Sequence, residues 1–216
     1  MEIAKQSAME VWRATLQYIM SEGVEFLDSN GRITKEVQNL KVEIQNPEQD
    51  IEEPVNMLRR SEEWVYPSSE EIANIITNKK LSPAYTYSYG PRIFNFNSVI
   101  NQMDDYMIPL LKFDRKSRRA FVAIWNPIED SSTFNKLVPG IIGVHFRNIG
   151  DKLTATAIVR SNDFFFGWPA NSFQLYTLMV YASQKLEVPT GSLTTFSISA
   201  HIFQDEYSYI KRVLGI

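Results

Sequence analysis

Four consecutive polar residues, Arg160, Ser161, Asn162 and Asp163, end an apolar stretch of the chain and are followed by three phenylalanines. Burying polar groups costs about 1–3 kcal/mol for each group that is left without a hydrogen-bond partner. A bound ligand is one way to supply the partners. Arginine suits a phosphate because its guanidinium presents a fork of donors and stays charged at any working pH. These residues therefore form a candidate site for a small anionic ligand.

Three further groups could take part in chemistry, and each also has a structural interpretation. Arg118 and Arg119 are adjacent and could bind phosphate or form a solvated turn. The amide of Asn171 could pair with the O4/N3–H edge of uracil or the matching O6/N1–H edge of guanine. It could equally cap the helix predicted to follow, and both roles can hold at once. His201 is one of two histidines and could be a ligand or a structural residue.

The spacing of apolar residues along the chain predicts the strands and helices that must position these side chains. Residues 141–146 and 153–159 are β-branched runs joined by an Asn-Ile-Gly-Asp segment, which predicts a hairpin. We expect further strands near 37–44, 120–125 and 193–198, an irregular acidic connection over 48–67, and an extended segment carrying Tyr85, Tyr87 and Tyr89. We expect helices over 7–22, from 68 through 76, over 99–110 and from about 171 to 186, and a partly helical tail over 203–216. This order predicts one α+β domain over residues 1–216, with a central sheet covered on one face by helices.

Composition narrows the class of protein. The 216 residues are 44% hydrophobic and 22% charged, with a net charge of −3, which favours a globular chain and argues against nucleic-acid and membrane partners. The chain has no cysteine, so disulfides, thiolate metal sites and thiol nucleophiles are excluded, and we predict no metal site. The first residues do not resemble a signal peptide, and no apolar run is long enough to span a bilayer. We therefore expect a cytoplasmic protein.

Several segments resemble the thymidylate synthase and pyrimidine-nucleotide hydroxymethylase family. They are R-S-N-D at 160–163, G-W-P-A-N at 167–171, S-A-H-I-F at 199–203, S-P-A-Y-T-Y-S-Y-G-P-R at 82–92, S-R-R-A-F-V-A-I-W-N-P at 117–127 and D-S-N-G-R at 28–32. The matches run through most of the chain in the order that the family has, and they are most similar to the short archaeal members. The resemblance implies a thymidylate synthase-like fold with a central mixed sheet. It also implies a homodimer that forms through the sheet face and shares its active sites.

The resemblance also implies ligands and roles. The substrate would be a nucleoside monophosphate and the cofactor 5,10-methylenetetrahydrofolate. The implied substrate contacts are Arg160, Ser161 and Arg32 to the 5′-phosphate, Arg118 and Arg119 from the second subunit, Asn171 to the base, and His201 to the sugar 3′-hydroxyl. The implied folate contacts are Asp163 to the pterin, Gly167, Trp168, and the apolar chain end at Ile216. Tyr89 would assist removal of a proton from the base, acting through water because a phenol has a pKa near 10.

One departure from the family pattern bears directly on the reaction. Family members have a cysteine after the proline that corresponds to Pro139, and this chain has Gly140. The family thiolate adds to C6 of the pyrimidine and so activates C5, and glycine has no side chain that could do so. Two smaller departures are Ala170, where the family often has Phe, and Phe203, where it has Tyr. Phe203 lacks the hydroxyl that would contact the sugar.

Three hypotheses follow from these departures. In the first, the protein is a one-carbon transferase, forming a methyl or hydroxymethyl product, that acts without cysteine on a ring electron-rich enough to attack methylene-folate unaided. In the second, it is a catalytically inactive nucleotide-binding paralogue. In the third, it is a thymidylate synthase whose nucleophile has been replaced at Gly140.

Overall fold

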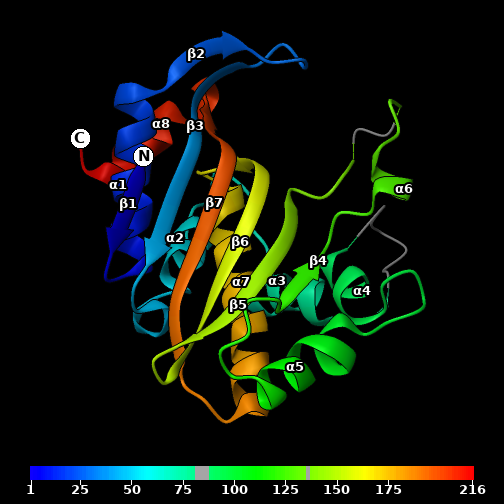
Figure 1. Ribbon diagram of the computed structural model, residues 1–216. Helices are drawn as coiled ribbons and strands as arrows, with labels where there is room; N and C mark the ends of the chain where they lie inside the picture. Colours follow the sequence, from blue (N-terminus) through cyan, green and yellow to red (C-terminus); the bar gives the residue numbers. More distant parts are fainter. Residues whose placement is uncertain (81–87, 135–136) are drawn as a thin grey trace.

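The computed structural model describes residues 1–80, 88–134 and 137–216, and its centre is a seven-stranded mixed sheet (Figure 1). The strands are β1 (Glu2–Lys5), β2 (Val24–Leu27), β3 (Ile33–Ile44), β4 (Phe121–Ala123), β5 (Ile141–Ile149), β6 (Lys152–Asp163) and β7 (Thr190–Phe203). Their order is β1-β3-β7-β6-β5-β4, with β2 paired to β3. The pairs β1/β3 and β6/β7 are parallel, and the other pairs are antiparallel. The prediction of an α+β fold with a central mixed sheet is confirmed.

Helices pack behind the sheet in the view of Figure 1, with the long helix α7 running across its middle strands. The helices are α1 (Ala8–Glu22), α2 (Glu53–Arg59), α3 (Ser69–Thr77), α4 (Tyr89–Phe94), α5 (Ile108–Phe113), α6 (Pro127–Asp130), α7 (Gly167–Leu186) and α8 (Tyr207–Leu214). The 3₁₀ turns η1 (Pro47–Gln49) and η3 (Gln204–Glu206) and the π-helix η2 (Gln102–Met107) complete the list. Within the described residues, no helix is long and apolar enough to cross a membrane.

The core forms where the sheet meets the helices. Strand β6 buries Leu153, Ala155, Ala157 and Val159 and leaves the intervening residues half-buried, as expected for a strand with one face against a core. On β7, Ile198 lies between core positions and is 45% exposed, so apolar surface remains on the opposite face. The pairing of two subunits through that face stays a prediction.

Local signals predicted several of these elements correctly. Ser7 and Ser68 each begin a helix with a capping box, and Gly150 occupies the left-handed region in the turn between β5 and β6. The predicted hairpin is therefore confirmed, and both of its strands are longer than predicted. Strand β7 also extends beyond the predicted 193–198, and this longer course places His201 near its end.

Four predictions of local structure were wrong. The connection 48–67 contains helix α2, whose buried face is Pro54, Val55 and Leu58. Tyr89 begins helix α4 and is not extended, while Tyr85 and Tyr87 lie outside the described residues. The helix predicted over 99–110 instead begins at Gln102 as η2 and continues past Pro109 into α5, which ends at Phe113, because a proline is tolerated in the first turn of a helix. Helix α7 begins at Gly167, so Asn171 lies inside the helix and does not cap it.

Candidate active site

Three segments of the chain meet at one end of the sheet. In the parallel β6/β7 pair, Ser161 lies opposite Ser199, and Asp163 lies opposite His201. On the other side of β6, the backbone N–H of Arg160 donates to the carbonyl of Gly140 at 2.9 Å. Strand pairing therefore brings the R-S-N-D segment, the S-A-H-I-F segment and the position of the missing cysteine together.

A cavity of about 660 Å³ opens at this end of the sheet. Its lining comes from β2, β3 and the turn between them, from β6 and β7, and from the segment before β5. The lining residues are Phe26, Asp28, Ser29, Asn30, Thr34, Leu137, Arg160, Ser161, Ser199, His201 and Phe203. Three of the predicted substrate contacts, Arg160, Ser161 and His201, therefore share one cavity. Its volume lies within the range of small-molecule sites.

Backbone carbonyls hold the Arg160 side chain in place. Its Nε donates to the carbonyl of Pro139 at 2.9 Å, and one terminal nitrogen donates to the carbonyl of Val138 at 3.0 Å. A guanidinium has five N–H donors, so these two bonds fix the group and leave donors for a ligand. Arg160 is thus a preorganised cation at the edge of the cavity.

The position of the missing cysteine faces Tyr89. A Cβ atom built on Gly140 would lie 3.7 Å from the Tyr89 hydroxyl and 3.3 Å from the backbone oxygen of Ser161. Gly140 does not have a positive φ, so its backbone conformation is open to other residues. The structure therefore brings two of the predicted catalytic positions together, beside the predicted phosphate contacts.

Asp163 caps the turn between β6 and α7. Its Oδ1 accepts from the backbone N–H groups of Phe165 at 2.8 Å and Phe166 at 3.2 Å. Burial raises the pKa of Asp163 to about 6, and these backbone donors oppose the rise. Gly167 lies against this carboxylate, since a Cβ there would be 3.3 Å from the Asp163 Cβ. Asp163 therefore has a structural role in this turn, and its contact with folate stays a prediction.

Trp168 does not face this cavity. It is fully buried, its Nε1 donates to the Thr195 hydroxyl at 3.2 Å, and its ring stacks on Phe164 with centroids 5.9 Å apart. Asn171 lies one turn further along α7, and its Nδ2 donates to the Asn162 Oδ1 at 3.2 Å. Trp168 therefore anchors the start of α7 in the core, and we do not include it in the proposed site.

His201 is a neutral group at the cavity wall. Burial lowers the pKa of His201 to about 4, and the positive charge of Arg32 lowers it further. Its Nδ1 lies 3.3 Å from the Ser199 hydroxyl, and its ring meets Phe203 edge-on with centroids 5.1 Å apart. At neutral pH His201 can therefore hydrogen-bond a ligand but adds no charge.

Arg32 is already paired with acidic groups. One terminal nitrogen donates to both oxygens of Asp205 at 2.8 and 3.0 Å, and it lies 3.8 Å from Glu206. The guanidinium carbon sits 3.4 Å from the centroid of the Phe203 ring. Arg32 does not line the cavity, so a direct phosphate contact would require this side chain to turn away from Asp205.

Three other predicted contacts lie elsewhere in the subunit. Arg118 and Arg119 are exposed in the turn before β4, and the carbonyl of Arg118 lies 3.1 Å from the His145 Nε2, midway along β5. Ile216 is 79% exposed beyond α8. The placement of Arg118 and Arg119 agrees with a role toward a second subunit, and that role stays a prediction.

Glu206 is a buried acid that the sequence reasoning missed. It is 3% exposed, and its Oε2 accepts from the backbone N–H of Phe203 at 3.0 Å. Burial, and next the nearby Asp163 carboxylate, raise the pKa of Glu206 to about 8, while Arg32 opposes the rise. The sequence around Glu206 is typical of an exposed polar turn and gives no sign that this acid is buried. Only the structure shows that it lies buried beside the end of β7.

The variant Glu206→Gln should change how stability depends on pH. An acid whose folded-state pKa is raised stabilises the fold at low pH and loses that contribution as the pH rises through the folded pKa, which is about 8 here. We therefore expect the free energy of unfolding of the wild type to fall by about 2 kcal/mol more than that of the variant between about pH 6.5 and about pH 8.5. His201, whose pKa in the fold is about 4, is present in both proteins, so its contribution to the pH dependence cancels in this comparison. Urea unfolding at both pH values measures the difference, and equal slopes for the two proteins would contradict the assignment.

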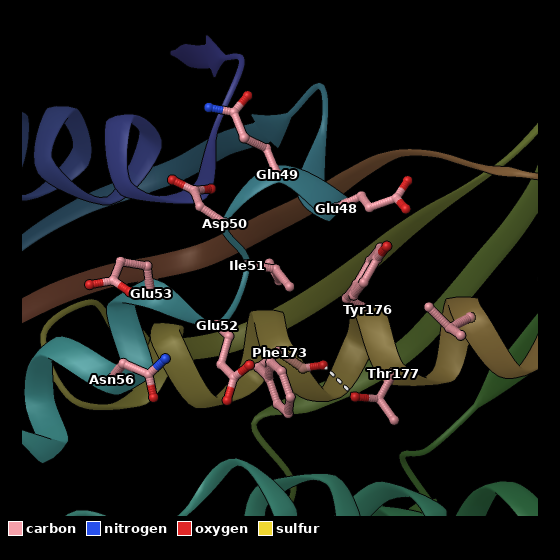
Figure 2. A pocket seen from close by; sticks show the side chains of 11 residues that line it. Glu48, Gln49, Asp50, Ile51, Glu52, Glu53, Asn56, Phe173, Tyr176 and Thr177 are labelled. Carbon is pink, nitrogen blue, oxygen red and sulfur yellow. Dashed lines mark hydrogen bonds between the residues drawn. The ribbon is translucent and has the colours of Figure 1, made fainter.

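A second cavity, of about 560 Å³, lies on the helical side between the 48–53 segment, α2 and α7 (Figure 2). None of the predicted site residues lines it. Its carboxylates serve the fold: Asp50 accepts from the backbone N–H groups of Ala8 and Met9, and Glu53 pairs with Arg60 at 2.8 Å. The candidate active site is therefore the cavity at the end of β6 and β7.

Comparison with known proteins agrees with this fold. A family profile described as "Thymidylate synthase" matches residues 7–215, so the chain belongs to the thymidylate synthase family. Proteins described as "Putative thymidylate synthase" are similar over nearly their full length. The one from Methanosarcina mazei is 30% identical over 212 residues, covering 98% of this chain and 94% of the relative. The one from Methanocaldococcus jannaschii is 32% identical over 220 residues, covering 97% and 94%. A "Thymidylate synthase" from Malacoplasma penetrans is 31% identical over 129 residues, covering 58% and 43%.

Proposed function

We propose that the protein transfers a one-carbon unit from 5,10-methylenetetrahydrofolate to the base of a nucleoside monophosphate, without a cysteine nucleophile. The observation that carries the proposal is the surroundings of Gly140. The Tyr89 hydroxyl, Arg160 and Ser161 stay assembled around a position that has no side chain. This arrangement of a hydroxyl, an oriented cation and a strand end around Gly140 supports a reaction at that position.

The residues of the cavity suit the phosphate and the sugar of a nucleotide, while Asn171 and Asp163, which do not line it, would contact the base and the folate from the start of α7. Arg160 and Ser161 would hold the phosphate, neutral His201 would bond the sugar, and Asn171 would bond the base. The folate supplies the carbon, and Asp163 at the start of α7 would accept from N–H groups of its pterin ring. Arg118 and Arg119 would complete the phosphate site from the second subunit of a homodimer.

A reaction that proceeds without a thiol requires a more reactive base in the substrate. The base must be electron-rich enough for its own carbon to attack, because Gly140 adds nothing to the ring. A water molecule would take the proton that leaves the attacking carbon, and the Tyr89 hydroxyl would orient that water by accepting a hydrogen bond from it. The absence of a side chain at Gly140 would also leave room for a larger base.

The direct test is to incubate the protein with methylenetetrahydrofolate and each nucleoside monophosphate in turn, in its ribose and deoxyribose forms. Mass spectrometry should show one nucleotide that gains a methyl or a hydroxymethyl group. Calorimetry without folate measures nucleotide binding separately. Tight nucleotide binding without any product would favour the inactive paralogue, and an absence of both folate and nucleotide binding would contradict the proposal.

The variant Gly140→Cys distinguishes the third hypothesis. We expect it to transfer no methyl group to deoxyuridylate, because Ala170 and Phe203 also depart from the family pattern. The thiol should fit, since the Cβ contacts at 3.3 and 3.7 Å require only a small adjustment. Gly140→Ala, which adds the same Cβ without sulfur, is the matched control. Methyl transfer by the cysteine variant alone would mean that the protein is a thymidylate synthase that lacks only its nucleophile.

A further inference from the structure

Asn171 is one end of a buried chain of polar side chains. Its Nδ2 donates to the Asn162 Oδ1 at 3.2 Å, and the Asn162 Nδ2 donates to the Ser197 hydroxyl at 3.0 Å. Asn162 is 1% exposed and Ser197 is fully buried. The sequence placed Asn162 in a candidate ligand site and gave Ser197 no role. We call these three residues the amide relay.

Three rigid elements hold the amide relay. Asn162 lies on β6, Ser197 on the neighbouring parallel strand β7, and Asn171 on α7, which packs on both strands. The relay atoms therefore cannot move apart without disturbing the core.

The amide of Asn171 could otherwise adopt two orientations. A terminal amide is nearly symmetric in shape, and turning it over exchanges its donor nitrogen and its acceptor oxygen. In the observed arrangement Asn162 turns its oxygen toward Asn171, so Asn171 must present its nitrogen there. If Asn171 reversed alone, two oxygen acceptors would face each other, so Asn162 would have to reverse with it and the Ser197 hydroxyl would have to change from acceptor to donor. The three residues must therefore rearrange together inside the core. The relay thus fixes the order of donor and acceptor that remains for a ligand.

We propose that Asn162 and Ser197 are positioning residues that set base specificity. This inference rests on the proposed function, in which Asn171 reads the base. The fixed order selects bases that present a carbonyl beside an N–H, as uracil and guanine do, over bases that present an amino group beside a bare ring nitrogen, as cytosine and adenine do. The base cannot reverse its edge to compensate, because its phosphate and sugar are bound at Arg160, Ser161 and His201.

Calorimetry with the four ribonucleoside monophosphates tests this assignment on the wild type, Ser197→Ala and Asn162→Ala. The wild type should bind the uracil and guanine nucleotides at least tenfold more tightly than the cytosine and adenine nucleotides. Both variants free the Asn171 amide to turn over, so the preference should fall to about threefold or less. Binding of the cytosine nucleotide should hold or improve, because its phosphate contacts are intact.

The matched control is Thr195→Val, which removes a buried side-chain bond on the same strand without touching the amide relay. It should keep the wild-type preference, and thermal melting should confirm that Ser197→Ala, the milder variant, remains folded. An unchanged preference in folded Ser197→Ala and Asn162→Ala would overturn the role of the relay while leaving the proposed function standing. A wild type that binds the cytosine and adenine nucleotides more tightly than the other two would also overturn the role of the relay. A wild type that binds none of the four nucleotides would overturn the proposed function and the relay together.

Discussion

Replacing Arg160 by alanine is expected to weaken the binding of the substrate nucleoside monophosphate about 100-fold, because the variant loses charge-assisted bonds worth roughly 1.5–3 kcal/mol each. Arg160 lines the cavity and is already oriented by the carbonyls of Val138 and Pro139, so little entropy is lost when it grips a phosphate. Calorimetry on the wild type and the variant, at one fixed salt concentration, measures the change.

Two further variants make this result specific. Arg160→Lys keeps the positive charge but loses the forked geometry, so it should bind more weakly than the wild type and more tightly than Arg160→Ala. Arg60→Ala removes an exposed arginine that pairs with Glu53 on α2, and it should bind like the wild type. Full affinity in folded Arg160→Ala would show that the phosphate is held elsewhere.

Replacing Tyr89 by phenylalanine is expected to lower turnover about 100-fold while leaving nucleotide affinity almost unchanged. The hydroxyl is 3.7 Å from a Cβ built at Gly140, so it faces the position where the family attacks the base. Loss of the group that orients the proton-accepting water affects the transition state more than the bound substrate, so kcat should fall and KM should stay within about twofold. Steady-state kinetics on the nucleotide identified by mass spectrometry provide the measurement.

Tyr181→Phe is the matched control for this variant. Its hydroxyl bonds Asp104 at 2.7 Å on the outer side of α7, away from the cavity. Tyr181→Phe should keep the turnover of the wild type. A similar fall in kcat in Tyr89→Phe and Tyr181→Phe would point to a general loss of packing. Equal falls in kcat/KM and in nucleotide affinity for Tyr89→Phe would assign Tyr89 to binding and not to proton transfer.

The part of the fold that could be predicted from the sequence depends on near neighbours in the chain. The capping boxes at Ser7 and Ser68 and the turn at Gly150 act over a few residues, and the alternation along β6 reports which face is buried. The missed helix α2 lies in an acidic segment whose buried face is short. The start of α7 was placed four residues late because Gly167 and Pro169 read as turn formers. Pro169 is tolerated there because the first turn of a helix needs no donor from it.

The part of the site that could not be predicted depends on contacts between distant residues. Arg32 reaches Asp205 across 173 positions of the chain, so it looked like a free phosphate ligand when it is already paired. Trp168 was expected beside the folate, yet its indole bonds Thr195 inside the core. Asn162 meets Ser197 across 35 positions, and no spacing rule connects them.

The sequence alone determined the family, the groups able to hold a phosphate and the absence of a thiol at Gly140, because residue identity carries those facts without coordinates. The tertiary structure decided which of these groups share one cavity, because the pairing of β6 with β5 and β7 sets the distances. It also decided which polar groups are already satisfied by the protein, such as Arg32, and how the Asn171 amide is oriented. Those outcomes depend on partners that packing brings together from far apart in the chain.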